Sequence, residues 1–478
     1  MRAKLQKFTD FTNTLLPHEV KYLLSIEQFH DDDRLQILHR IAHNIEQGNA
    51  FIDYDTTINK RKYSNLKTWV IERLQMVDVD VQFEWMTELE KAIMTDSIVA
   101  DEEKKLLKAI RHYDKPVFYF QKFYEIIQHY RHFLLIRMRY GDHKLADDFL
   151  KKHHKNYEHT KRISDKIHEA TLDIVNQYAS SNTESKRWEK WLVKTFYDET
   201  LDGHNRYLAL VRLTFIGFNY RNFDSLRQPF DVLDDFFTSG KYYSKRLLLN
   251  YYGNRLLLHT KFKELEKAVY YGYLSIRGKN NEYIHYINNL SAVLQRQGRH
   301  KEALELMRSA FAEMKATQNY HDKIGFVAFY GKALNQTEEY RSAENYCESF
   351  LRVYKEQIFN HRWHIFFTIY LETLLYQKKY DKIHKTVQKY QLLEKDSIYQ
   401  KRAVYLPTIT WYAYTASFQV LQFSKQDFKT EILNYIEAVK MDKYKFTQAE
   451  ILLKTIQPHI SEVIQLVRPR LYDLGIRI

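Results

Sequence analysis

Residues that end or kink chain segments are scarce in this sequence. It contains only 12 Gly and 6 Pro among 478 residues. Because tight turns between strands depend on Gly and on other residues that accept positive φ, a strand-rich fold would lack its turns. Long tracts rich in Gly, Ser and Pro, which are typical of disordered linkers, are also missing. The sequence therefore predicts an almost entirely helical protein.

The sequence also contains very little cysteine and no long apolar run. Cys347 is the only cysteine, which excludes an internal disulfide and favours a reducing compartment. No uncharged apolar run reaches the roughly eighteen residues that a membrane span requires. The N-terminal segment lacks the apolar stretch and small-residue cleavage site of an export signal. We therefore expect a soluble, cytoplasmic protein without a membrane partner.

The excess of positive charge lies in one part of the chain. The formal net charge is +13, yet residues 1–200 contain 32 Lys and Arg against 32 Asp and Glu. The remaining residues carry 41 basic and 28 acidic side chains. A basic surface favours an acidic partner, either a nucleic acid or an acidic protein segment. The alternative is that these charges only solvate helix surfaces, since they are scattered along the chain.

Residues 1–182 are predicted to form an N-terminal helical domain. The run Val117–Arg139 is apolar on nearly all sides, which indicates a buried helix. We expect Gly141 to interrupt the chain, a return helix to follow, and a separate helix to cover Lys161–Tyr178. The polar segment SSNTES then marks a boundary near Asn182.

From about His204 to Met441, small residues, tyrosines and leucines recur with a period of about forty residues. The clearest copy, NNLSAVLQRQGRHKEALELMRSA, has spacings that place Leu290, Gly298 and Ala303 between two antiparallel helices. We expect repeats over residues 183–441 and capping helices over 442–478, because an end repeat must cover its apolar surface. The predicted repeats start near His204, Arg246, Ile284, Lys323 and His364, with a weaker sixth near Thr410.

These residues resemble the tetratricopeptide repeat, in which the first helix carries a small residue, the turn a Gly or Tyr, and the second helix an early Ala. The copies at Ile284–Ala310 and Lys323–Phe350 match best, whereas the copy near His364 has Ile383 in place of the usual Ala. The resemblance covers about half of the chain. It implies an all-α solenoid, a right-handed superhelix whose first helices line a concave groove for an extended peptide or a partner's helix.

The resemblance also implies which residues face this groove. Asn254 and Asn289 match the two peptide-holding asparagines of members that bind chaperone tails. The basic residues that clamp the peptide's terminal carboxylate in those members are replaced by Asn250, Gly325 and Phe329, so we expect no such clamp. An asparagine amide can form hydrogen bonds with a peptide backbone whatever the peptide's side chains are. The alternative is that these asparagines are only solvated positions on the helix surface. The expected groove residues are Arg212, Asn250, Asn254, His285, Asn288, Asn289, Arg296, Lys332 and Asn335.

The sequence shows no complete pattern of catalytic or metal-binding residues. His154 and His159 are five residues apart and lie on different helix faces, which excludes a helical zinc-protease motif. Glu125, His129 and His132 share a face, but we expect them to satisfy one another or neighbouring tyrosines, since further ligands are missing. The prediction is no enzyme activity, no cofactor and no metal.

The predicted function is a non-catalytic scaffold that holds a peptide or partner-protein segment, of acidic character, in the groove. The alternative is a regulator that senses a peptide or contacts nucleic acid through the basic repeat half. A helical bundle followed by such repeats is also the layout of bacterial peptide-sensing regulators, an analogy of architecture alone.

Overall fold

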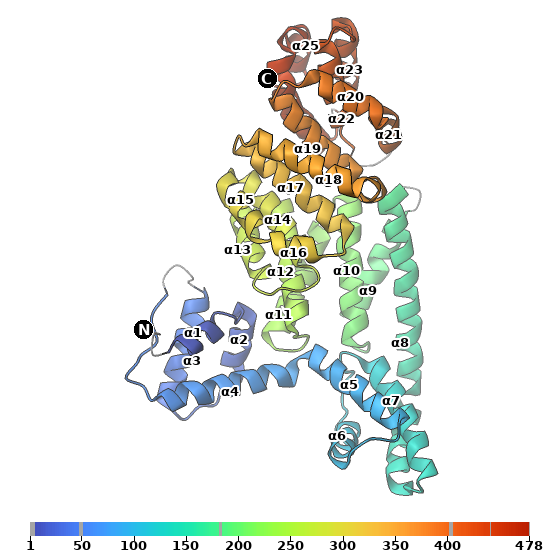
Figure 1. The fold of residues 1–478 in the computed structure, drawn as a ribbon. Helices are drawn as coiled ribbons and strands as arrows, with labels where there is room; N and C mark the ends of the chain where they lie inside the picture. Colours follow the sequence, from blue (N-terminus) through green and yellow to red (C-terminus); the bar gives the residue numbers. More distant parts are fainter. Residues whose placement is uncertain (1–4, 47–50, 181–183, 401–404, 440, 478) are drawn as a thin grey trace. The chain divides into compact units, whose positions relative to one another are not determined.

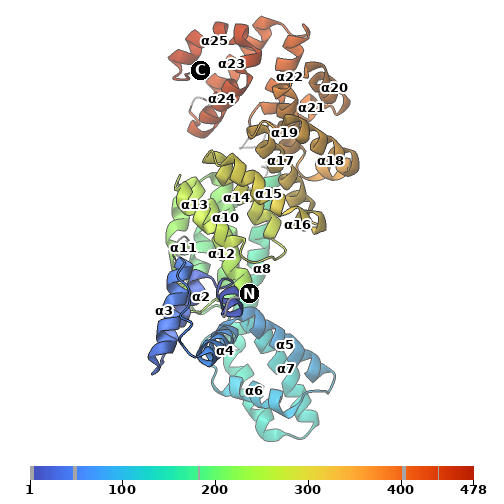
Figure 2. The ribbon, with the colours of Figure 1, turned by 60° about the vertical axis from the view of Figure 1, so that its left-hand side comes forward.

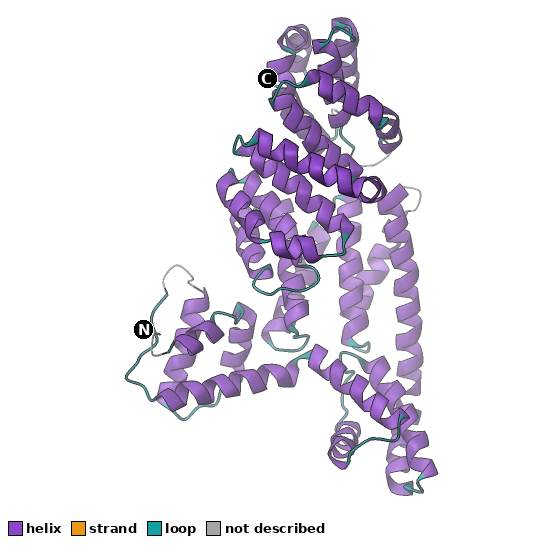
Figure 3. Cartoon of the chain, viewed as in Figure 1, coloured by secondary structure: helices purple, strands orange, loops and turns teal. Residues whose placement is uncertain are grey.

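The computed structural model describes residues 5–46, 51–180, 184–400, 405–439 and 441–477. Every regular element in these ranges is a helix, so the predicted all-α class is confirmed (Figure 3). Within the same ranges, no helix is both long enough and apolar enough to cross a membrane. The chain divides into two compact units, Met1–Leu258 and His259–Ile478.

The first unit begins with four helices around a small apolar core (Figure 1). Leu23 and Leu66 are fully buried in it. Pro17 opens the second helix, where the Glu19 carboxylate accepts a hydrogen bond from the Leu16 amide at 2.7 Å, so this helix end is capped. The four helices are α1 (Gln6–Thr12), α2 (Pro17–Ile26), α3 (Asp32–Glu46) and α4 (Lys60–Val77).

Four further helices enclose a second apolar cluster in the same unit. They are α5 (Val79–Met94), α6 (Ala100–Arg111), α7 (Phe120–Ile136) and α8 (Tyr140–Ser180). One side of α7 is buried, and its Tyr130 is completely enclosed. The other side is not buried as predicted: Leu135 and Ile136 are 49% and 78% exposed.

The predicted break at Gly141 and the separate helix from Lys161 are wrong. A single helix of 41 residues, α8, covers both segments. Gly141 lies in the first turn of α8, and the chain instead breaks before the helix, at Met138, whose φ is 56°. No Gly or Pro occurs in residues 142–180, so nothing in the sequence ends the helix earlier.

Hydrogen bonds connect α2 to the last helices of the first unit. The ring nitrogens of His18 lie 2.7 Å from the Tyr252 hydroxyl and 2.8 Å from Asp234 Oδ1, and Tyr243 donates a hydrogen bond to Glu19 at 2.7 Å. These bonds join residues more than 200 positions apart, so the N-terminal helices are an integral part of this unit. The elements are a 3-10 turn (Ser185–Trp188), α9 (Glu189–Tyr197), α10 (Gly203–Tyr220), a second turn (Asp224–Leu226), α11 (Arg227–Thr238) and α12 (Lys245–Lys261).

The second unit is a run of consecutive helices (Figure 2). Its elements are α13 (Leu265–Ser275), α14 (Tyr283–Arg296), α15 (His300–Ser309), α16 (Phe311–Ala316), α17 (Tyr320–Gln336), α18 (Tyr340–His361), α19 (Trp363–Tyr376), α20 (Tyr380–Lys389), α21 (Leu392–Tyr399), α22 (Thr408–Gln419), α23 (Lys425–Val439), α24 (Lys443–Ile456), a 3-10 turn (Gln457–His459) and α25 (Ser461–Asp473).

Helix packing in the second unit alternates as a solenoid requires. The first helices of successive pairs, α14, α17, α19 and α22, pack side by side. Each second helix packs on its own first helix and on the next one: α15 contacts α14 and α17, α18 contacts α17 and α19, and α20 contacts α19 and α22. The α-solenoid architecture is therefore confirmed for these helices, and its right-handed superhelix stays a prediction.

The predicted repeat starts agree closely with helix starts. Each lies within three residues of the first residue of α10, α12, α14, α17, α19 or α22. Two helices, α24 and α25, follow Met441, where the capping pair is expected. The boundary expected near Asn182 lies outside the described residues, and the division into 1–182, 183–441 and 442–478 stays a prediction.

Candidate peptide-binding face

Along the middle of each first helix in the second unit runs a stripe of side chains that neighbouring helices do not fully bury. In α14 the stripe has i, i+4, i+7 and i+11 spacing, so its side chains share one face of the helix. The stripes of α17 and α19 follow the same rule, and the three helices pack side by side. We call this surface the first-helix face: His285, Asn289, Ala292 and Arg296 in α14, Phe329, Lys332 and Gln336 in α17, and Ile365, Thr368 and Glu372 in α19.

Two of the expected groove asparagines lie beside this face and are almost completely buried. Asn288 is 3% exposed and donates a hydrogen bond to the backbone carbonyl of Asp322 at 3.0 Å. Asn335 is 4% exposed; it donates to Glu372 at 3.2 Å and accepts from Thr373 at 3.0 Å. Both amides therefore join adjacent first helices. The expected residues on the face itself are His285, Asn289, Arg296 and Lys332.

The other three expected residues belong to the first unit. Asn254 donates a hydrogen bond to Asn250 at 2.9 Å, and Asn250 also accepts one from the Tyr207 hydroxyl at 2.8 Å. Arg212 donates to the hydroxyl of Thr171 in α8 at 2.9 Å. The nine expected residues therefore form two sets, one in each unit.

Several polar atoms on or beside the first-helix face are buried and have no hydrogen-bond partner among the described residues. They are Asn288 Oδ1, Asn289 Nδ2, Gln336 Oε1 and Thr368 Oγ1. Asn289, Gln336 and Thr368 are themselves half-buried, so the face presents amide and hydroxyl side chains on three adjacent helices, which is the chemistry that an extended peptide backbone can match.

A charged cluster surrounds Asp322 at the start of α17. The Nδ1 atoms of His285 and His321 lie 3.1 Å and 3.6 Å from its Oδ1, and Asn319 donates to its Oδ2 at 2.7 Å. Burial by itself would raise the pKa of Asp322, but the hydrogen bonds from the two histidines outweigh burial and hold that pKa well below its usual range. The ionised carboxylate therefore orients His285 at the edge of the first-helix face.

The missing side chain at Gly325 allows a guanidinium to approach α17. A Cβ at this position would lie 2.5 Å from Nη1 of Arg362 and 3.2 Å from Nδ2 of Asn288. Arg362, between α18 and α19, thus supplies a cation close to the face. Sequence reasoning missed Arg362, because the repeat pattern assigns no role to a residue between helices.

Glu372 is a second residue of the face that sequence reasoning missed. It accepts the hydrogen bond from Asn335, and the Tyr412 hydroxyl lies 3.5 Å from its Oε1. Burial raises the pKa of Glu372, and the nearby charge of Lys332 opposes that rise only in part. Glu372 is the only acidic residue in the apolar helix WHIFFTIYLETLLY, and this isolation was a usable signal.

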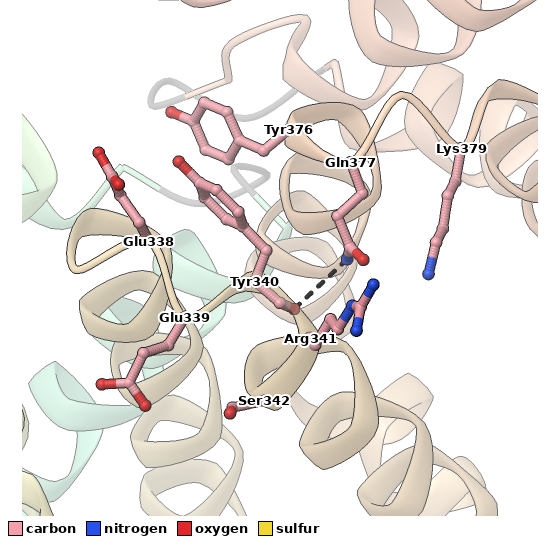
Figure 4. A pocket seen from close by; sticks show the side chains of 8 residues that line it. All are labelled: Glu338, Glu339, Tyr340, Arg341, Ser342, Tyr376, Gln377 and Lys379. Carbon is pink, nitrogen blue, oxygen red and sulfur yellow. Dashed lines mark hydrogen bonds between the residues drawn. The ribbon is translucent and has the colours of Figure 1, made fainter.

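A cavity of about 570 Å³ opens at the turns that follow α17 and α19 (Figure 4). Two of its lining residues, Tyr340 and Tyr376, stack with ring centroids 5.2 Å apart, and Gln377 donates to the Tyr340 carbonyl at 3.3 Å. Tyr376 is one helical turn beyond Glu372, so the cavity continues the stripe of α19. Acidic and basic side chains both line it: Glu338, Glu339, Arg341 and Lys379.

In the part of the chain that the structure describes, no three His, Cys, Asp or Glu side chains are arranged to hold a metal ion. Glu125 accepts hydrogen bonds from the Tyr157 hydroxyl at 3.2 Å and from Gln121 at 3.1 Å. The first of these is a tyrosine contact of the kind predicted for this buried polar seam.

Comparison with known proteins identifies one repeat. Residues 284–317, which include α14, α15 and α16, match the family model of the tetratricopeptide repeat. No curated protein matches the chain. The resemblance predicted from the sequence is thus confirmed in this segment. The described ranges contain 25 α-helices in all. Such repeats indicate a protein-interaction scaffold in general and are typically non-catalytic.

Proposed function

We propose that the first-helix face binds an extended segment of a partner protein and that the chain acts as a non-catalytic scaffold. The observation that carries the proposal is the row of half-buried polar side chains on α14, α17 and α19, with Asn289, Gln336 and Thr368 among them. A peptide backbone presents N–H and C=O groups along its whole length, and amide side chains can bond both. In this proposal, Asn289 supplies the central donor.

The charges near the face favour an acidic segment. Arg296 is exposed in the last turn of α14 and Lys332 lies on α17. The carboxylate of Asp322, at the edge of the face, is already in contact with His285 and His321. Glu372 is the single carboxylate among the residues that define the face, and burial disfavours its ionised form. Complementary charge would select an acidic partner and speed its association.

The test uses peptides selected from a display library on the wild-type protein. Their Kd is then measured for the wild type, for N289A and for N345A, which changes an exposed asparagine of α18. We expect N289A to weaken binding roughly tenfold, because its amide bonds the peptide backbone in a partly buried position. N345A should bind as the wild type does.

Equal affinity of N289A and the wild type would contradict the role of Asn289. The salt dependence separates this mode from nucleic-acid binding: an acidic peptide held mainly by amide hydrogen bonds should lose less affinity with added salt than a phosphate backbone, whose contacts weaken steeply.

A further inference from the structure

A basic cleft lies between the second helices α18 and α20. Its volume is about 400 Å³, within the range of roughly 300–1,000 Å³ typical of small-ligand sites. It is separate from the first-helix face, to which α18 and α20 contribute no residue. The charged side chains that line it are Glu348, Arg352, Lys355, Lys382, Lys385 and Lys389.

The one acidic residue of the cleft is already neutralised. Glu348 pairs with Lys382 and accepts a hydrogen bond from the Tyr370 hydroxyl at 2.9 Å. Lys382 also pairs with Glu344 at 2.6 Å, and Lys379 pairs with the same carboxylate at 2.5 Å. These contacts hold α20 against α18 and leave no negative charge for the remaining cations.

Four cations of the cleft are uncompensated. Arg352 and Lys355 are three residues apart on α18, and Lys385 and Lys389 are four apart on α20, so each pair shares a helix face. Within the described ranges, none of the four has an acidic group within 4.0 Å. The other acidic residues nearest in sequence, such as Glu356, do not line the cavity.

Tyr390 fixes two of these cations. The ammonium groups of Lys355 and Lys389 lie 5.8 Å and 5.4 Å from the centre of its ring. Such contacts hold a cation over the ring face. The ring is therefore engaged by the protein's own lysines, which disfavours the stacking of a nucleobase on it.

We propose that this cleft binds a small polyphosphate, a ligand with at least two linked phosphate groups. Each carboxylate of a peptide brings one negative charge, so four cations in this volume would need four acidic side chains. A phosphate group carries roughly one to two negative charges near neutral pH, and lysine binds it as a point charge. Two or three linked phosphates therefore match the charge of the cleft.

The probe is inorganic tripolyphosphate, titrated into the full-length protein by calorimetry. The variant K385Q/K389Q removes two charges from the cleft, and the control K301Q/K315Q removes two exposed lysines that do not line it. We expect the cleft variant to bind at least roughly tenfold more weakly, because charged contacts are lost. The control should stay within about twofold of the wild type, since distant surface charges are screened.

Circular dichroism of both variants shows whether the fold is kept, and both substitutions are on exposed helix positions. Absence of tripolyphosphate binding by the wild type, or equal loss in the control, would overturn the proposal. It would also be overturned if a single-stranded oligonucleotide or a polyglutamate peptide bound the cleft more tightly than tripolyphosphate. The result does not depend on the N289A experiment, because Asn289 lies on the first helix α14 and the cleft lies between second helices.

Discussion

Single polar residues in this protein take their roles from burial, which sequence spacing only partly predicts. The repeat pattern assigns Asn289 to a peptide groove, and in the structure it is half-buried on the first-helix face. The same pattern treats its neighbour Asn288 as equivalent, yet Asn288 is 3% exposed and bonds the Asp322 backbone. Glu372 and Arg362 are missed for the same reason: their positions depend on how adjacent helices pack, and a single repeat unit does not contain that information.

Asp202 and His204, at the start of α10, should affect stability in opposite senses. Burial raises the pKa of Asp202 from 3.8 to about 7 and lowers the pKa of His204 from 6.5 to about 4. Asp202 therefore contributes stability that is full below about pH 4 and is lost as the pH rises to about 7. His204 contributes stability that is full above about pH 6.5 and is lost as the pH falls to about 4.

Replacing either residue should isolate its own contribution to the pH dependence. D202N keeps the oxygen that accepts the Asn205 amide at 2.8 Å, but it cannot titrate. We expect the free energy of unfolding of the wild type, relative to D202N, to fall between pH 4 and 7 by up to about 1.4 kcal/mol per pH unit. H204Q should show the reverse difference. Urea titrations over this range measure both, and parallel curves for all three proteins would refute the assignment.

Helices and their pairing are the scale at which the sequence is most informative. Ala303 and Ala343 were expected early in the second helices, and both are completely buried there. Ile383 takes the corresponding place in α20 and is also fully buried. The exception is α8, because a glycine in a first turn such as Gly141 does not stop a helix when neither Gly nor Pro follows it.

The buried residue early in each second helix should have a size that fits its own helix pair. A343I forces a larger side chain between α17 and α18 and should destabilise the protein by roughly 1–3 kcal/mol. I383A leaves a cavity beside α20 and should cost roughly 2–5 kcal/mol. The exposed A312I in α16 serves as the control, with a change within about 0.5 kcal/mol. Urea unfolding followed by circular dichroism measures all three, and an A343I variant as stable as A312I would contradict the described packing.

Over the whole chain, composition predicts the helical class and the location of the net charge but not how that charge is used. The excess of basic residues lies in residues 201–478. The structure separates those residues into cations engaged in ion pairs, such as Lys379 and Lys382 with Glu344, and cations without such pairs, such as Lys385 and Lys389. Pairing arises between successive helices, so it could not be derived from the charge count.

The central claim is that a partner segment lies along the first-helix face, and site-specific photocrosslinking tests it most directly. The photoreactive residue p-benzoylphenylalanine replaces either Phe329, on α17 of that face, or Val353, which is 68% exposed on α18. A peptide selected on the wild-type protein should crosslink from position 329 and not from 353, and N289A should reduce the yield. Crosslinking from position 353 alone, or a yield that N289A leaves unchanged, would contradict the account.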